Sequence, residues 1–170
     1  MSACKTLQDD ELARALVGAW QLVRWQIDYP PGNRSTQPFG PAPEGLLLYT
    51  ADGHMSASMQ RPARPRLSRA NVGAISDAEK AGAFDTCLQY AGRWRVSGAD
   101  VHHDVELALN PNLPGTRQVR EAVLRGDELE LLAVEALETP GSVRVHRILW
   151  RRARPHGVQA GFRGQAGFRC

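Results

Sequence analysis

Alternation of apolar and polar residues is the main pattern of this chain, and it predicts strands along most of its length. The first strand is expected over residues 16–29, where the alternation places Trp20 and Trp25 on opposite faces. Both faces are apolar through the first half of this long segment, which is typical of a sheet that curls until its ends meet. One tryptophan is therefore expected to fill a barrel interior, and the other to cover its wall or base.

Seven further segments carry strand patterns, and two of them flank an Asp52-Gly53 turn that is a strong hairpin signal. The seven segments cover residues 45–50, 54–59, 93–96, 101–109, 117–124, 128–134 and 142–152. Together with the first strand they predict a mainly β fold, a single eight-stranded antiparallel barrel with one inserted α-helix. Eight strands are enough to close a barrel around one small ligand.

The inserted helix is expected over residues 77–90. Ser76 and Glu79 have the spacing of a capping box at its start. Cys87 would lie in the middle of this helix as a small packed residue. A stripe of apolar residues at helical intervals would pack the helix against the barrel, and its members are Ala81, Phe84, Leu88 and Ala91.

Three other segments have no strand pattern. Residues 1–14 are acidic first and then apolar, which favours a short helix before the first strand. Residues 30–43 are rich in Pro and Gly and predict a long irregular loop. Residues 60–75 have no clear period, and the loop over residues 61–76 is either a lid or a mobile solvated segment.

Composition limits the possible functions. The chain has 170 residues, enough for one domain with a substantial core, and we expect a domain over 1–154 and a tail over 155–170. The absence of a signal-like or membrane-spanning apolar run predicts a cytoplasmic protein without membrane contact. The net charge of +3 is mild and forms no basic stripe, so nucleic-acid binding is not expected. Three cysteines without metal-like spacing predict free thiols and no metal site.

The most distinctive short sequences follow one another in a recognisable order. They are Leu16–Trp20, Pro38–Pro41, Gly45–Ser56, Arg61-Pro62, Tyr90, Gly92-Arg93, His103 with Glu106, Pro111-Asn112, Gln118–Arg120 and Leu149–Arg151. In this order they resemble the bacterial lipocalin-like domain family, whose members are calycin-type barrels. The resemblance extends from about residue 16 to residue 152. It does not include the tail after Arg154, and Asp104 stands where the family often has a second histidine.

The resemblance implies a barrel with an apolar cavity. It also implies that Trp20, in its Gly-x-Trp motif, packs near an arginine of the closing strand, for which Arg151 and Arg152 are the candidates. Family members associated with natural-product pathways include ligand binders and cofactor-free cyclases or isomerases. The fold alone does not separate these uses.

Three residues are candidates for catalysis. His103 lies on the more apolar face of its strand, and it is either a buried imidazole bonded to a backbone carbonyl or a cavity acid/base. Glu106 has the opposite parity: it is a cavity carboxylate neutralised by Arg120 if its face is the lumen, and a surface charge otherwise. Tyr49 is either a hydroxyl donor to a ligand carbonyl or a wall aromatic.

Six further residues are candidates for ligand contacts: Trp25, His54, Tyr90, Trp94, Arg120 and Arg147. Arg147 shares a face with Val143, Val145 and Leu149, so it either meets an anionic ligand group or extends to the rim. Tyr90 and Trp94 alternatively serve only to hold the inserted helix.

The sequence therefore predicts a protein that binds an apolar small molecule, a polyketide- or terpenoid-like intermediate, in the barrel lumen. We expect it to promote a cofactor-free cyclisation or isomerisation by holding a reactive conformer. The alternatives are a non-catalytic carrier, or a dimerisation module with a filled core. A homodimer is compatible with both the enzyme and the carrier.

Overall fold

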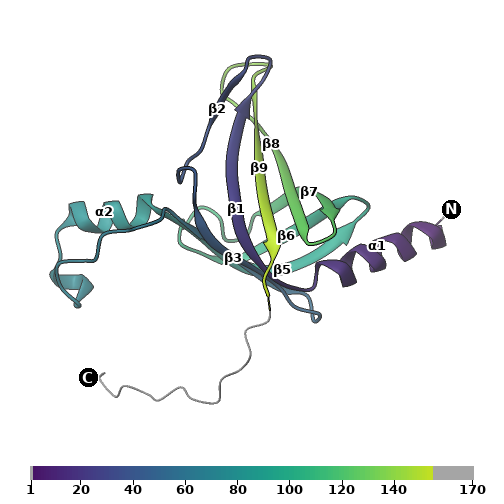
Figure 1. Cartoon of the computed structure of the whole chain (residues 1–170), viewed down its shortest axis with the longest axis horizontal. Helices are drawn as coiled ribbons and strands as arrows, with labels where there is room; N and C mark the ends of the chain where they lie inside the picture. The colour runs from purple at the N-terminus through teal and green to yellow at the C-terminus, as the bar shows by residue number, and fades with distance from the viewer. Residues whose placement is uncertain (1, 155–170) are drawn as a thin grey trace.

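The computed structural model describes residues 2–154 and contains a closed antiparallel barrel with one additional strand (Figure 1). The sheet order is β2-β1-β3-β4-β5-β6-β7-β8-β9, and pairing of β1 with β9 closes it. The strands are β1 (Gly18–Tyr29), β2 (Arg34–Thr36), β3 (Glu44–Tyr49), β4 (His54–Gln60), β5 (Cys87–Ser97), β6 (Asp100–Ala108), β7 (Arg117–Arg125), β8 (Glu128–Ala136) and β9 (Val143–Arg152). This confirms the predicted barrel. β2 is an extra strand in a loop predicted to be irregular, and the predicted tail lies outside the described residues.

A β-bulge in β1 overturns the prediction that Trp20 and Trp25 face opposite sides. The register against β9 shifts between Leu22 and Arg24, so one extra residue enters the strand there. Trp20 and Leu22 are buried before the bulge, and Trp25 is buried after it. Both tryptophans therefore point inward.

The inserted helix is shorter than predicted. Helix α2 (Asp77–Asp85) begins at the predicted capping box, in which the Ser76 hydroxyl accepts from the amide of Glu79, but it ends at Thr86. Cys87 starts β5 instead of lying within the helix, because the end of β4 pairs with this segment. The predicted packing stripe is wrong as well, since α2 has no buried residue and Phe84 is 45% exposed. Figure 1 shows α2 projecting away from the barrel.

A second bulge, between β5 and β6, reverses the faces of the last residues of β6. Ala91 pairs with Leu107 but its neighbour Gly92 pairs with Val105, so Glu106 is the extra residue. Val101, His103 and Val105 are buried as the alternation predicts, whereas Leu107 is 69% exposed. Gly92 permits the bulge, because a Cβ there would collide with the carbonyl oxygen of Asp104 and lie 2.8 Å from the Glu106 amide nitrogen.

A Gly92→Ala substitution is expected to lower the free energy of unfolding by about 2–3 kcal/mol, because the colliding atoms belong to the backbone and cannot rotate away. Urea denaturation measures this loss. Gly82→Ala is the matched control: it adds the same methyl group in α2, where a Cβ meets no atom within 4 Å. It should leave stability unchanged or raise it by up to about 1 kcal/mol. Equal effects of the two substitutions would contradict the steric argument.

The two largest fully buried side chains lie where β1 meets the closing strand. Trp20 and Trp150 are fully buried there, and the guanidinium carbon of Arg152 lies 4.1 Å from the centre of the Trp20 ring. Of the two candidate arginines, Arg152 thus makes the cation–π contact that the family resemblance implied. Helix α1 (Ser2–Leu16) is joined to this end, because Trp20 Nε1 donates to the Leu16 carbonyl at 2.9 Å.

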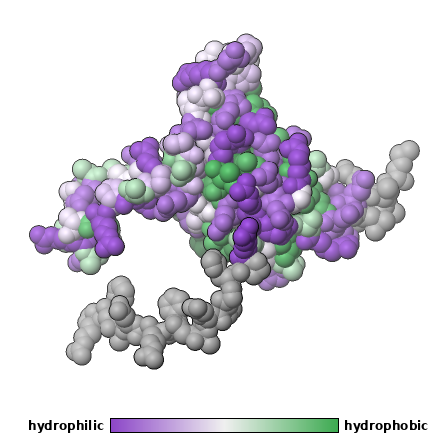
Figure 2. Space-filling model, viewed as in Figure 1, coloured by the Kyte–Doolittle hydropathy of each residue, from purple (hydrophilic) through white to green (hydrophobic). Residues whose placement is uncertain are grey.

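No helix in the part of the chain that the structure describes is long and apolar enough to cross a membrane. Polar side chains cover most of the face shown in Figure 2, while apolar ones gather near its centre and along its lower edge.

Candidate functional site

One end of the barrel encloses a cavity of about 800 Å³, a size typical of small-molecule sites. Its outer part is lined by exposed apolar residues, including Phe84 and Val134, which mark the opening. Its inner part is formed by buried apolar and aromatic side chains, namely Trp25, Phe39, Met59, Tyr90 and Ile148. Most of these residues come from strands, so the fold itself fixes their positions.

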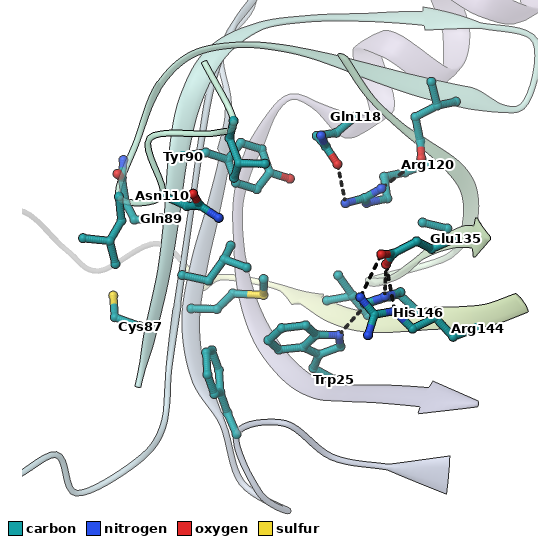
Figure 3. A pocket seen from close by; sticks show the side chains of 18 of the residues that line it. Trp25, Cys87, Gln89, Tyr90, Asn110, Gln118, Arg120, Glu135, Arg144 and His146 are labelled. Carbon is teal, nitrogen blue, oxygen red and sulfur yellow. Dashed lines mark hydrogen bonds and ion pairs between the residues drawn. The ribbon is translucent and has the colours of Figure 1, made fainter. Parts of the chain in front are cut away.

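A buried hydrogen-bonded group lies beneath the inner end of the cavity. His103 is 0% exposed, and its Nε2 lies 2.7 Å from the hydroxyl oxygen of Tyr49. Its Nδ1 lies 3.0 Å from the hydroxyl oxygen of Tyr90. Of these three residues, Tyr90 alone also lines the cavity, and Figure 3 shows its hydroxyl pointing into the open space.

The environment keeps all three groups neutral at neutral pH. Burial, together with the positive charge of Arg120, lowers the pKa of His103 to about 3. Burial also raises the pKa of Tyr49 and of Tyr90 above the ordinary value of 10.0. None of the three is therefore set to exchange a proton near pH 7.

Hydrogen-bond pairing assigns the protons within this group. A neutral imidazole has one donor and one acceptor nitrogen. The buried Tyr49 hydroxyl has Nε2 of His103 as its hydrogen-bond partner, so its proton is satisfied when it donates there. Nδ1 then carries the hydrogen and donates to Tyr90. The Tyr90 O–H is consequently left free to donate into the cavity.

A second polar group lies on the wall formed by β8 and β9 (Figure 3). Arg144 donates two hydrogen bonds of 2.8 Å to the carboxylate of Glu135. His146 donates from Nε2 to the same carboxylate at 3.0 Å and accepts at Nδ1 from Trp25 Nε1 at 3.3 Å. Burial lowers the pKa of His146, and the hydrogen bond from Arg144 lowers the pKa of Glu135. The charges of this group are therefore balanced within it.

Arg120 and Gln118 project from β7 onto the inner face, since they pair with Val101 and His103 of β6. Arg120 Nη2 donates to Gln118 Oε1 at 3.4 Å, and its Nη1 donates to a backbone carbonyl at 3.1 Å. Within residues 2–154 no carboxylate lies within the 4.0 Å of an ion pair with Arg120.

The structure brings six of the sequence-predicted site residues to the interior of the barrel. Trp25, Tyr90 and Arg120 line the cavity, and Tyr49 and His103 lie beneath it. His103 is buried and satisfied, although its partners are tyrosine hydroxyls and not the backbone carbonyl considered from the sequence. Trp94 is buried farther from the cavity, where its ring lies 4.6 Å from that of Tyr49 and its Nε1 donates to Thr50.

Glu106 and His54 lie on the outside of the barrel. The bulge turns Glu106 outward, where Arg93 Nε lies 3.5 Å from its carboxylate and both side chains are more than half exposed. Of the two alternatives for Glu106, a cavity carboxylate neutralised by Arg120 and a surface charge, the structure shows the surface charge, so its choice as a catalytic candidate is wrong. His54 lies beside the hairpin turn, 3.2 Å from Asp52 and half exposed.

Arg147 also faces outward, where two hydrogen bonds of 3.1 Å join it to the nearly buried Glu130. The apolar row that it shares with Val143 and Val145 covers the outer face of β9. The inner row of this strand contains Ile148 and Trp150, so the expectation of Arg147 in the lumen is wrong in its choice of face.

Eight polar residues of the cavity lining were not found from the sequence: Asp85, Gln89, Asn110, Arg117, Gln118, Glu135, Arg144 and His146. A usable signal was present in β9, because Trp150 is the bulkiest apolar residue of the strand. Taking Trp150 as inward places Ile148, His146 and Arg144 on the same face. Charged residues on a lumen-facing row are unusual, and this made the outer row look like the core.

Comparisons with known proteins agree with this architecture. The family model of the lipocalin-like domain matches residues 17–153. The 4'-hydroxy-3'-methoxypropiophenone carrier protein ppsC of Aspergillus oryzae is 34% identical over 106 residues, which cover 58% of this chain and 96% of that protein. No solved structure matches the chain at a significant level. With its closed barrel, its cavity and these matches, the chain belongs to the lipocalin-like domain family.

Proposed function

We propose that this protein is a non-catalytic carrier that holds one small molecule with an apolar, aromatic body inside the barrel. The observation that carries this proposal is the cavity of about 800 Å³, lined by Trp25, Phe39 and Tyr90. Aromatic rings favour a flat, ring-containing ligand through stacked and edge-to-face contacts. The polar groups on the walls can orient such a ligand.

An oxygenated aromatic ligand, such as a polyketide-derived aryl ketone or phenol, fits these walls better than a purely hydrocarbon terpenoid. Tyr90 offers a hydroxyl donor and Arg120 offers guanidinium N–H groups, and both would lose hydration without compensation against a hydrocarbon. The related ppsC protein is named as the carrier of an aryl ketone, 4'-hydroxy-3'-methoxypropiophenone. That name supports the same ligand class here.

The ionisation of the buried groups favours a carrier over a cyclase or isomerase. A general acid or base works best when its pKa lies near the working pH. His103 has a pKa of about 3, and burial raises the pKa of both tyrosines that contact it. This group therefore orients a ligand more readily than it moves a proton.

Cofactor-free isomerisation remains the second candidate, and one observation favours it. His146 lies on the cavity wall, and the hydrogen bond between its Nε2 and Glu135 offsets part of the lowering of its pKa by burial. Its Nδ1 is occupied by the indole of Trp25, which would have to move aside before this nitrogen could accept a proton from a ligand.

Binding and turnover are best measured on the same samples. We expect 4'-hydroxy-3'-methoxypropiophenone to quench the tryptophan fluorescence saturably at one site per chain and to be recovered chemically intact by mass spectrometry. Trp25→Phe should remove most of the quenching while binding persists in calorimetry, because Trp25 lines the cavity and Trp20 does not. Conversion of the ligand that is lost in His146→Gln would instead establish the isomerase. If no member of a panel of aryl ketones and phenols binds, both the carrier and the isomerase proposals are overturned.

A further inference from the structure

We infer that Arg120, together with Tyr90 and Gln118, forms an oxyanion-binding subsite in the cavity, so that the preferred ligand carries an ionised oxygen on its apolar body. A carboxylate is the simplest such group. The inference rests on the proposed binding function and adds a chemical class of ligand to it.

The first argument is the unbalanced charge of Arg120. The other cationic residues of the cavity wall have carboxylate partners, since Arg144 binds Glu135 and Arg117 binds Asp104. Within the described part of the chain Arg120 has no such partner, and it donates hydrogen bonds to two neutral oxygens, the Val119 carbonyl and Gln118 Oε1. A partly buried guanidinium without a counter-ion is costly, and an anionic ligand would offset that cost.

The charge of Arg120 acts on the whole inner cavity. Added to burial, which is the larger cause, it lowers the pKa of His103 beneath the floor and the pKa of His146 on the wall formed by β9. Asp85, the remaining unpaired charge on the lining, lies at the exposed end of α2 and not beside Arg120. A ligand anion entering the lumen would therefore meet a net positive potential at its inner end.

Tyr90 and Gln118 complete the subsite geometrically. The proton assignment of the His103 group leaves the Tyr90 hydroxyl as a donor into the cavity, and Figure 3 shows Tyr90 and Arg120 pointing into the same space. Gln118 donates to Thr116 at 3.1 Å, which keeps its oxygen directed at the guanidinium. Gln118 is thus a positioning residue for Arg120, while Arg120 and Tyr90 supply the donors.

The test compares two probes with the same apolar body, 4-phenylbutanoate and its methyl ester, by titration calorimetry. We expect the native protein to bind the carboxylate at least about 10-fold more tightly than the ester, the ratio that corresponds to 1.4 kcal/mol. Arg120→Gln should abolish this preference and leave the affinity for the ester within about 3-fold. Arg120→Lys should retain part of the preference because it keeps the charge.

Two further variants sharpen the test. Tyr90→Phe should weaken binding of the carboxylate by about 10-fold and binding of the ester much less. The reason is that a hydrogen bond to a charged group is stronger than one to a neutral group. Arg151→Gln is the matched control, because it removes an arginine that is exposed and paired with Glu128 outside the barrel. It should leave the preference unchanged.

The possible results separate the subsite from the carrier function. Equal binding of the two probes by the native protein, or a carboxylate preference that survives Arg120→Gln, would overturn the subsite while the carrier function stands. Failure of both probes to bind would count against the subsite and the cavity function together. Ester binding that persists in Arg120→Gln also shows that this variant is folded.

Discussion

Trp20→Ala is expected to cost about 3–5 kcal/mol of unfolding free energy, the largest effect of any single substitution considered for this chain. Trp20 is 0% exposed, so its removal leaves a cavity where β1, β3 and β9 meet. The substitution also removes the ring beneath Arg152 and leaves the Leu16 carbonyl without its indole donor. Chemical denaturation followed by far-ultraviolet circular dichroism measures the loss.

Two companion variants separate the contributions to this loss of unfolding free energy. Arg152→Gln removes the cation–π contact and keeps the indole, and it should cost about 1–2 kcal/mol, because the guanidinium also donates to two carbonyls at the end of α1. Leu107→Ala removes a side chain that is largely exposed and should change stability by less than about 0.5 kcal/mol. A Trp20→Ala protein as stable as the Leu107→Ala protein would contradict the packing argument.

Acid should destabilise this protein well above the pH at which its carboxylates become protonated. The pKa of His103 is about 3 in the folded chain, against about 6.5 when unfolded, so the unfolded state binds more protons between these values. The stability that depends on a neutral His103 ring is fully present above pH 6.5, and it is lost as the pH falls toward 3. Between pH 8 and pH 5 the loss should be about 2 kcal/mol from His103 alone, because each pH unit below 6.5 costs up to about 1.4 kcal/mol. Denaturation curves collected across this range measure it.

A variant that replaces His103 together with both of its tyrosine partners tests whether His103 causes this pH dependence. His103→Leu alone would leave the hydroxyls of Tyr49 and Tyr90 without their partner, whereas a combined Tyr49→Phe, His103→Leu and Tyr90→Phe protein leaves no orphaned polar atom. The combined variant should lose most of the slope between pH 8 and pH 5, and His146 accounts for part of what remains. A slope equal to that of the native protein would show that other groups cause it. Titration of the His103 ring by NMR, expected to stay neutral down to about pH 4, gives an independent check.

Local signals in the sequence were sufficient for the architecture. The Asp52-Gly53 turn, the capping box at Ser76 and the apolar alternation of the strands each reflect interactions within a few residues, and the structure confirms all three. The end of the inserted helix was missed because Leu88 and Ala91 continue the helical spacing of Ala81 and Phe84, although they lie on opposite faces of the strand that forms. Pairing with β4, a contact distant in sequence, decides between them.

The composition of the candidate site depended on two bulges that no local pattern reveals. One extra residue in β1 brings Trp25 to the same side as Trp20, and one extra residue in β6 turns Glu106 outward. A change of one residue exchanges the two faces of a strand, so every inference from parity beyond a bulge is reversed. The cavity residues of β9 were missed for a related reason, since its apolar outer row resembled a core.

The contrast between a packed end and a hollow end of the barrel also has an evolutionary meaning. Substitutions at Trp20 or Trp150 act on the whole fold, because these side chains join the first strand to the last. Substitutions at Phe84 or Val134 alter a wall that faces open space, where a new side chain finds room without displacing neighbours. A duplicated gene can therefore acquire a different cargo through a few changes at the hollow end while its product keeps the thermal stability of its parent.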